Sequence, residues 1–201
     1  MSLLTLIRHG QSSYNLENRF TGTFNVPLTP FGEEEDRQAA AKLKSFKYDI
    51  AYTSMLQRAQ QSLSILLQVI KQSGIPVIRN AALNERMYGN LQGLNKAAAA
   101  ARYGTEQVEI WRRSYRVHPP GGESLEDTFN RVIPYYKTEI EPKLKERKNI
   151  LIVAHGNSLR ALMMYLENIS AEEIAAINIP TGMPRNYVFD NNLEITSAAY
   201  L

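Results

Sequence analysis

Cysteine is absent from the 201-residue sequence. Without thiols the chain has no disulfide, no thiolate nucleophile and no thiolate metal site, which is typical of a reducing cytoplasm. No apolar run approaches the roughly 18 residues that a membrane-spanning helix needs. The N-terminus, MSLLTLIRHG, also lacks the basic segment followed by a long apolar stretch that marks a signal peptide. These absences predict a soluble cytoplasmic protein with no membrane partner.

A strong excess of charge of either sign is also missing. The chain carries 23 basic and 20 acidic residues, a net charge of +3. Its basic residues are mixed with acids, as in KLKERK at 143–148, and no long basic run is interleaved with aromatic residues. The composition therefore argues against nucleic acid as a partner and leaves small anions open. The length predicts a single domain over residues 1–201.

What the sequence does contain is an alternation of strand-like and helical segments. Apolar strand patterns occur at 3–7, 48–54, 75–80, 149–155, 187–190 and 193–198, and helical patterns at 33–46 and 56–72. This order predicts an α/β fold with a mostly parallel central sheet and helices on both faces. Residues 95–140 read as helices without a strand, so we expect a helical insertion over a ligand site at the carboxyl ends of the strands.

Two of the three histidines end such strands. LTLIRHG at 4–10 and NILIVAHG at 149–156 both close on His-Gly, so His9 and His155 are expected at the same edge of a parallel sheet. A single histidine after a strand is usually structural, but the pair favours a site. Closely spaced zinc ligands, a G-x-S-x-G elbow and a P-loop are all missing, so we predict neither a metal site nor serine hydrolase chemistry.

Arginine and glycine surround these histidines. Arg8 adjoins His9, Arg58 follows the second predicted strand, and Gly156 and Asn157 open a helix whose free N–H groups suit an anion. Guanidinium groups bind phosphoryl oxygens in a bidentate manner, so these are the parts of a phosphate site. Taken alone, Arg58 would be read as a surface arginine on an amphipathic helix.

An unprotonated imidazole in such a site can attack phosphorus and form a phosphohistidine. Neighbouring arginines disfavour the charged ring, which helps to keep His9 neutral. The reaction also needs a group that donates and accepts the proton of the transferring oxygen. Glu85, in the loop after the third predicted strand, is the best candidate, although a loop glutamate is by itself usually solvated and idle.

The motifs RHGQSSYN, FTG, YTSMLQRAQQS, LNERMYGNLQGLNK, WRRSY, PPGGESL and AHGNSLRAL closely resemble those of the cofactor-dependent phosphoglycerate mutases in the histidine phosphatase superfamily. The resemblance covers nearly the whole chain. It implies that His9 is the phosphorylated nucleophile, that Glu85 transfers the proton, and that three residues bind the phosphoryl group: Arg8, Arg58 and His155. It further implies that the substrate's phosphate and carboxylate are bound by Ser12, Asn15, Thr21, Gly22, Tyr88, Lys96, Arg112, Arg113, Gly156 and Asn157.

The activity implied by this resemblance is an isomerase of glycolysis and gluconeogenesis that interconverts 3- and 2-phosphoglycerate. The resemblance also implies that 2,3-bisphosphoglycerate primes the enzyme and that no metal is needed. Because members of the family form dimers or tetramers, it further implies a homo-oligomer. The chain passes quickly from WRRSY to PPGGESL and ends in ITSAAYL, which favours a second hypothesis, a phosphomonoesterase built on the same histidine, whereas the intact LNK and WRRS clusters argue against it. A non-enzymatic phospholigand-binding module is a third hypothesis, which the presence of every catalytic residue type argues against.

Overall fold

A six-stranded sheet forms the centre of the protein in the computed structural model, which describes residues 1–201. The strand order is β3-β2-β4-β1-β5-β6. The four strands β3, β2, β4 and β1 are parallel, whereas β5 and β6 run antiparallel to their neighbours. The strands are β1 (Ser2–Arg8), β2 (Ile50–Thr53), β3 (Val77–Arg79), β4 (Ile150–Ala154), β5 (Arg185–Phe189) and β6 (Ile195–Tyr200). The predicted mostly parallel sheet is confirmed.

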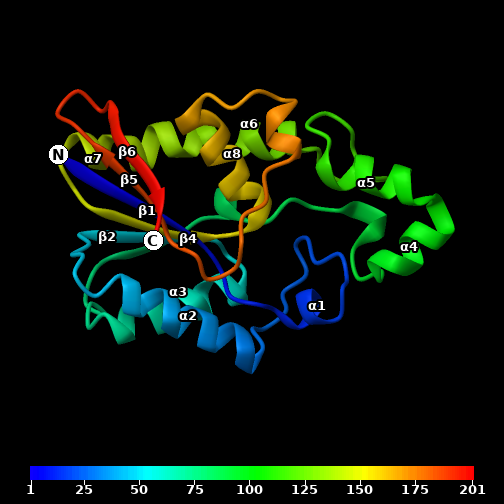
Figure 1. The fold of residues 1–201 in the computed structure, drawn as a ribbon, viewed down its shortest axis with the longest axis horizontal. Helices are drawn as coiled ribbons and strands as arrows, with labels where there is room; N and C mark the ends of the chain where they lie inside the picture. The colour runs from blue at the N-terminus through cyan, green and yellow to red at the C-terminus, as the bar shows by residue number, and fades with distance from the viewer.

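Helices cover both faces of this sheet (Figure 1). Alternate residues of a strand point to opposite faces, so Leu4 and Leu6 of β1 join one apolar cluster while Leu3 and Ile7 join the other. One face packs against α6 (Leu125–Tyr135) and α8 (Gly156–Glu167), the other against α2 (Pro30–Lys42) and α3 (Gln57–Val69). The central strands are therefore buried on both sides, which explains their continuous apolar sequence.

The predicted helix at 33–46 starts and stops earlier than expected. Thr29 caps α2, because its hydroxyl accepts the Gly32 N–H at 3.0 Å, and Pro30 occupies the first helical position. The helix ends at Lys42, four residues before the predicted end. The helix predicted at 56–72 is α3, trimmed at both ends to Gln57–Val69.

Residues 95–140 contain no strand, as predicted, but only the first half of this region stands away from the sheet. α4 (Lys96–Tyr103) and α5 (Thr105–Arg113) form a lobe beside the short α1 (Ser13–Leu16), as Figure 1 shows. A small separate apolar cluster that includes Phe20, Ala99 and Val108 holds this lobe. α6 instead packs on α8, and a π-helical turn (Tyr136–Ile140) and α7 (Glu141–Lys145) follow it.

None of these helices is both long and apolar enough to cross a membrane.

Candidate active site

β1 and β4 bring the two histidines together. Arg8 pairs with Ala154 at the carboxyl ends of these neighbouring parallel strands, and the His9 amide donates to the Ala154 carbonyl at 3.1 Å. The rings of His9 and His155 meet edge to face with their centroids 4.9 Å apart. Both side chains are buried, at 3% and 0% exposure. The expectation that the two His-Gly strand ends share one edge is confirmed.

Hydrogen bonds select one tautomer of His9. Its Nδ1 lies 2.6 Å from the carbonyl oxygen of Gly10, an acceptor, so Nδ1 carries the hydrogen. Its Nε2 accepts from Nε of Arg58 at 3.2 Å and therefore carries the lone pair. The other two guanidinium nitrogens of Arg58 donate to the carbonyls of Gly22 and Phe24, both at 2.9 Å. Arg58 is thus a fixed buried cation that directs the basic nitrogen of the histidine.

Burial and positive charge both keep His9 neutral. Its pKa is lowered well below the usual value, first by desolvation and then by the charges of Arg58 and Arg8. Burial is thus a larger cause of the low pKa than the neighbouring arginines, which are the only cause that the sequence reveals. A neutral ring with a lone pair on Nε2 has the protonation state that a nucleophile needs.

His155 is oriented from the opposite side. Its Nε2 lies 2.7 Å from the hydroxyl of Ser54, and that hydroxyl also accepts the Leu56 amide at 3.1 Å. The Ser54 hydroxyl hydrogen is then free to point at Nε2, which leaves a hydrogen on Nδ1 of His155. This Nδ1 is buried and has no partner in the protein. It is a donor available to a bound anion.

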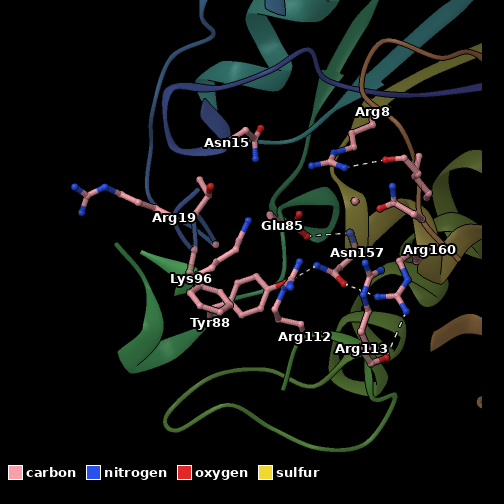
Figure 2. Close-up of a pocket in the computed structure, with 16 residues that line it drawn as sticks. Arg8, Asn15, Arg19, Glu85, Tyr88, Lys96, Arg112, Arg113, Asn157 and Arg160 are labelled. Atoms are coloured by element: carbon pink, nitrogen blue, oxygen red, sulfur yellow. Dashed lines mark hydrogen bonds between the residues drawn. The ribbon is translucent and has the colours of Figure 1, made fainter. Parts of the chain in front are cut away.

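A cavity of about 160 Å³ lies at this edge of the sheet, with Arg8 in its lining (Figure 2). Its lining is mostly polar and cationic, and side chains from distant parts of the chain converge on it. Of the predicted residues, the following line it: Arg8, Asn15, Thr21, Gly22, Glu85, Tyr88, Lys96, Arg112, Arg113, Gly156 and Asn157. His9, Arg58 and His155 are buried beside Arg8 rather than in the lining.

Glu85 is held at one wall of the cavity by two backbone amides. Its Oε1 accepts from the N–H of Asn157, in the first turn of α8, at 3.1 Å and from the N–H of Arg86 at 2.8 Å. Its Oε2 accepts no hydrogen bond and lies near the start of α8, 3.7 Å from where a side chain on Gly156 would begin. The carboxylate is thus fixed by one oxygen and leaves the other free to exchange a proton.

Tyr88 stands beside Glu85 and is fixed by two donors. Its hydroxyl oxygen accepts from Arg86 at 3.0 Å and from the side-chain amide of Asn157 at 3.2 Å. Burial alone would raise the pKa of Tyr88, but the charge of Arg86 and these hydrogen bonds lower it on balance. Because both neighbours donate, the tyrosine's own hydrogen is free to point into the cavity.

A second cationic group lines the cavity from the helical lobe. Lys96 opens α4, and Arg112 and Arg113 close α5, so the two helices of the lobe aim their charges at one cavity (Figure 2). Burial and the charge of Arg112 lower the pKa of Lys96. Glu85 is the only acidic residue in the lining. The cavity therefore suits a ligand with more than one negative charge.

The chain matches the histidine phosphatase superfamily (branch 1) over residues 4–192. It belongs to this superfamily. Curated relatives support the same placement: a 2,3-bisphosphoglycerate-dependent phosphoglycerate mutase of Cytophaga hutchinsonii is 56% identical, with 100% of this chain and 94% of the relative aligned. A protein of the same name from Rhizobium rhizogenes is 50% identical over 98% of this chain and 95% of its own length.

Solved structures of the superfamily share the fold. Bacillus stearothermophilus YhfR superposes with a TM-score of 0.85 at 21% identity, covering 99% of this chain and 96% of that one. The α-ribazole phosphatase from Shigella flexneri gives a TM-score of 0.82 at 23% identity, covering 98% and 95%. At such identities the likeness concerns the fold alone.

Ser12, one of the predicted substrate-binding residues, does not line the cavity. Ser12 is fully buried and caps α1, exchanging hydrogen bonds with Asn15, so the structure does not bring its side chain to the cavity. It positions Asn15, which does line the cavity.

The cavity also contains residues that the sequence argument missed: Arg19, Phe20, Arg160, Asn178 and Ile179. Arg160 lies one helical turn after Asn157 and donates to its side-chain oxygen at 3.1 Å, a spacing that the sequence does show. Ile179 contributes its carbonyl, which accepts from Arg8 at 2.8 Å. A contact made by a backbone carbonyl cannot be predicted from the pattern of side chains in the sequence.

Proposed function

We propose that the protein interconverts 3-phosphoglycerate and 2-phosphoglycerate through a phosphohistidine on His9. The observation that carries this proposal is a neutral histidine, with its lone pair directed by Arg58, buried next to a cavity whose lining includes Arg8 and the three cations of the helical lobe. A phosphoglycerate has two anionic ends, so one cationic group can hold the transferring phosphoryl group and the other the carboxylate. The names of the relatives at 50 and 56% identity support this choice of substrate.

Two of the residues that would hold the phosphoryl group have hydrogen-bond donors that pair with no protein atom. Nε of Arg8 and Nδ1 of His155 are buried without a partner, and the ring of His155 meets the ring of His9 edge to face. A phosphoryl group accepts several hydrogen bonds, and charge-assisted ones are the strong ones. 2,3-Bisphosphoglycerate fits the same two-ended set of cations, and its role would be to supply the first phosphoryl group to His9.

The reaction then needs two transfers. In the first, the substrate hydroxyl attacks phosphorus, the P–Nε2 bond breaks with its electron pair returning to the ring, and Glu85 takes the hydroxyl proton. In the second, Nε2 attacks the other phosphoryl group and Glu85 returns the proton to the leaving oxygen. The free Oε2 of Glu85 suits both steps, because Oε1 is already held by two amides.

Phosphorus NMR of the protein with 3-phosphoglycerate and a trace of 2,3-bisphosphoglycerate tests this proposal, with a chelator present. Growth of the 2-phosphoglycerate signal without inorganic phosphate is the expected result. Inorganic phosphate as the main product would overturn it in favour of the phosphomonoesterase. His9→Ala must lose both phosphoenzyme and turnover, and full mutase activity in that variant would remove His9 from the reaction.

The second cationic group has its own test. Replacing Arg112 and Arg113 by Ala should raise the KM for phosphoglycerate much more than the KM for a small aryl phosphate, which has no carboxylate to bind. Arg116→Ala is the matched control, since Arg116 follows closely in the chain, is 78% exposed and does not line the cavity. Equal losses on both substrates would show that the pair does not bind the carboxylate.

We also propose that the chain is one domain, residues 1–201, and that it forms a homo-oligomer in the cytoplasm, where its proposed substrate occurs. Both main apolar clusters lie on a single sheet, which supports one domain. β3 is an edge strand whose Val77 and Ile78 are 40% and 38% exposed, and an exposed apolar edge favours pairing with another chain. Light scattering with size-exclusion chromatography measures the assembly, and a monomer at micromolar concentration would contradict the oligomer.

A further inference from the structure

Two neighbouring carboxylates of α2 bind the backbone immediately after His9. Asp36 Oδ1 accepts the Gly10 N–H at 3.2 Å, and Glu35 Oε2 accepts the Gln11 N–H at 2.7 Å. Neither carboxylate lines the cavity, and neither has a part in the reaction described above. Helix α2 therefore fixes two consecutive peptide groups behind the nucleophile.

The peptide between Gly10 and Gln11 links Glu35 to His9. Its carbonyl accepts the Nδ1–H of His9 at 2.6 Å, while its N–H donates to Glu35 at 2.7 Å. Hydrogen bonds in such a chain polarise one another, so a carboxylate at the N–H end makes the carbonyl oxygen a stronger acceptor. The histidine thus has an indirect carboxylate partner, with one peptide group between them.

Glu35 is itself held from the other side. Its Oε1 accepts the hydroxyl of Thr181 at 2.6 Å. The turn that follows packs directly on Glu35: Gly182 has a φ of +60°, and a Cβ there would lie 2.9 Å from the Cβ of Glu35. The backbone of the helix also packs directly on the loop. A Cβ on Gly10 would lie 2.1 Å from the carbonyl oxygen of Gly32, and a Cβ on Gly32 would lie 2.1 Å from the carbonyl oxygen of Gln11. Three segments therefore fix the carboxylate.

We propose that Glu35 is a positioning residue for His9, acting through the Gly10–Gln11 peptide to keep the hydrogen on Nδ1 and the reactive lone pair on Nε2. This inference rests on the proposed function of His9 as the phosphoryl carrier. With Nδ1–H retained, cleavage of the P–Nε2 bond returns the electron pair to a ring that leaves neutral. Without that hydrogen the ring would have to leave as an imidazolate anion, a much poorer leaving group.

The phosphorylated state gives a second reason. An imidazole that carries a phosphoryl group on Nε2 and a hydrogen on Nδ1 has a positively charged ring. A polarised carbonyl at 2.6 Å stabilises that charge, whereas the buried surroundings and the charges of Arg8 and Arg58 oppose it. Glu35 therefore offsets, from behind the ring, part of the cost that the arginines in front of it impose.

The test is Glu35→Gln in the full chain, with Glu34→Gln as the matched control. Gln keeps an oxygen for the Gln11 N–H but removes the charge. Glu34 is on the same helix and carries the same charge, but it is 53% exposed and pairs only with Arg37 and Gln38. Two readouts are compared: the ¹H and ¹⁵N signals of the His9 Nδ1–H in the free protein, and kcat with KM for the mutase reaction.

For Glu35→Gln we expect an upfield shift of the Nδ1 proton, because its hydrogen bond weakens, and a fall in kcat of about tenfold, in the range seen when an indirect partner of an active-site histidine is removed. KM should change less than twofold, since no ligand contact is lost. Glu34→Gln should match the wild type in both readouts. An unchanged Nδ1 signal and unchanged kcat in a folded Glu35→Gln protein overturn the proposal, and so do equal losses in the two variants.

Thr181→Ala is the second variant, and it tests the proposal if Glu35→Gln fails to fold. This variant keeps the Glu35 carboxylate but removes the hydrogen bond from Thr181 that helps to fix it. The Nδ1 proton signal of His9 should therefore shift upfield, with a smaller loss of kcat than in Glu35→Gln. An unshifted Nδ1 signal would count against the proposal. The Nδ1 signal needs no substrate. A wild-type protein that shows the expected signal but accepts no phosphoryl group from 2,3-bisphosphoglycerate would refute the proposed function and leave the positioning role standing.

Discussion

Asp36 is a buried acid whose ionisation should cost stability. Its side chain is fully buried, Oδ1 accepts the Gly10 amide at 3.2 Å, and Oδ2 has no partner. Burial raises its pKa from 3.8 to about 7, against the smaller opposing effect of its hydrogen bonds with Ser62 and Gly10. We therefore predict that Asp36→Asn removes a pH-dependent loss of stability that the wild-type protein shows between pH 4 and pH 7.

The sign follows from proton binding. Between pH 4 and pH 7 the folded protein keeps a proton on Asp36 that the unfolded chain has already released, so stability falls as the pH rises and is level above about pH 7. Each pH unit is equivalent to about 1.4 kcal/mol, and the shift from 3.8 to about 7 therefore corresponds to about 4 kcal/mol. His9 and His155 contribute in the opposite sense, because their pKa values are lowered, and stability from them rises with pH up to the unfolded value.

Comparison of wild type and Asp36→Asn isolates the aspartate, since the histidines are common to both. Urea unfolding at pH 5, 6, 7 and 8 gives the two free energies of unfolding. The asparagine buries an amide without a full set of partners, which lowers its stability by a constant amount, but the difference between the proteins should still move by about 2 kcal/mol in favour of the variant from pH 5 to pH 7. Glu34→Gln, with an exposed acid on the same helix, should show no such change. Parallel pH profiles for Asp36→Asn and wild type would refute the reasoning.

Three further predictions concern packing and binding. Gly10→Ala should lower the free energy of unfolding by about 3 kcal/mol in urea titrations, because a Cβ would lie 2.1 Å from the Gly32 carbonyl oxygen; a loss below about 0.5 kcal/mol would contradict the contact. Glu167→Gln should cost about 2 kcal/mol, since it removes the charge from a largely buried pair with Arg185 at 2.8 Å and weakens the bond that Tyr187 donates; a neutral result would show that solvent already screens the pair. Saturating 2,3-bisphosphoglycerate should stabilise the fold by about 2.7 kcal/mol at a hundredfold excess over Kd, seen as a rise in Tm that 0.5 M salt reduces.

The sequence predicts the sheet well where strands are buried on both faces and poorly where they are not. β1 and β4 are largely apolar runs that each end shortly before a His-Gly pair, and the predicted bounds of both agree with the structure to within one residue at each end. β3 shrank from six predicted residues to Val77–Arg79 because it is an exposed edge strand that no second face constrains. The start of α2 was in principle readable, since Thr29 before Pro30 is a strong helix-start signal. The π-helical turn at Tyr136–Ile140 has no comparable signal.

For the site, the sequence locates side chains but not the backbone that orients them. The two His-Gly strand ends and the arginine beside one of them identify a phosphate-binding chemistry without any structure. The partner of the His9 Nδ1–H, however, is the carbonyl of Gly10, and the carboxylate behind that peptide comes from Glu35. In the sequence Glu35 is one of several adjacent acids at the start of a helix, where favourable interaction with the helix dipole already accounts for all of them. Only the tertiary contact of α2 with the loop separates it from Glu34.

Unpartnered buried donors around the cavity favour the binding of an anion there. Eight buried side-chain nitrogen and oxygen atoms lack a hydrogen-bond partner, and five of them are nitrogens of Arg8, Arg86, His155 and Arg160, of which Arg8 and Arg160 line the cavity. An unsatisfied buried polar group costs about 1–3 kcal/mol, so a protein would not collect them in one place by chance. A phosphoryl oxygen returns that energy by accepting from donors that are already fixed and already desolvated. The same preorganisation that weakens the empty fold therefore stabilises the transferring phosphoryl group, whose oxygens can accept from these fixed donors throughout the transfer.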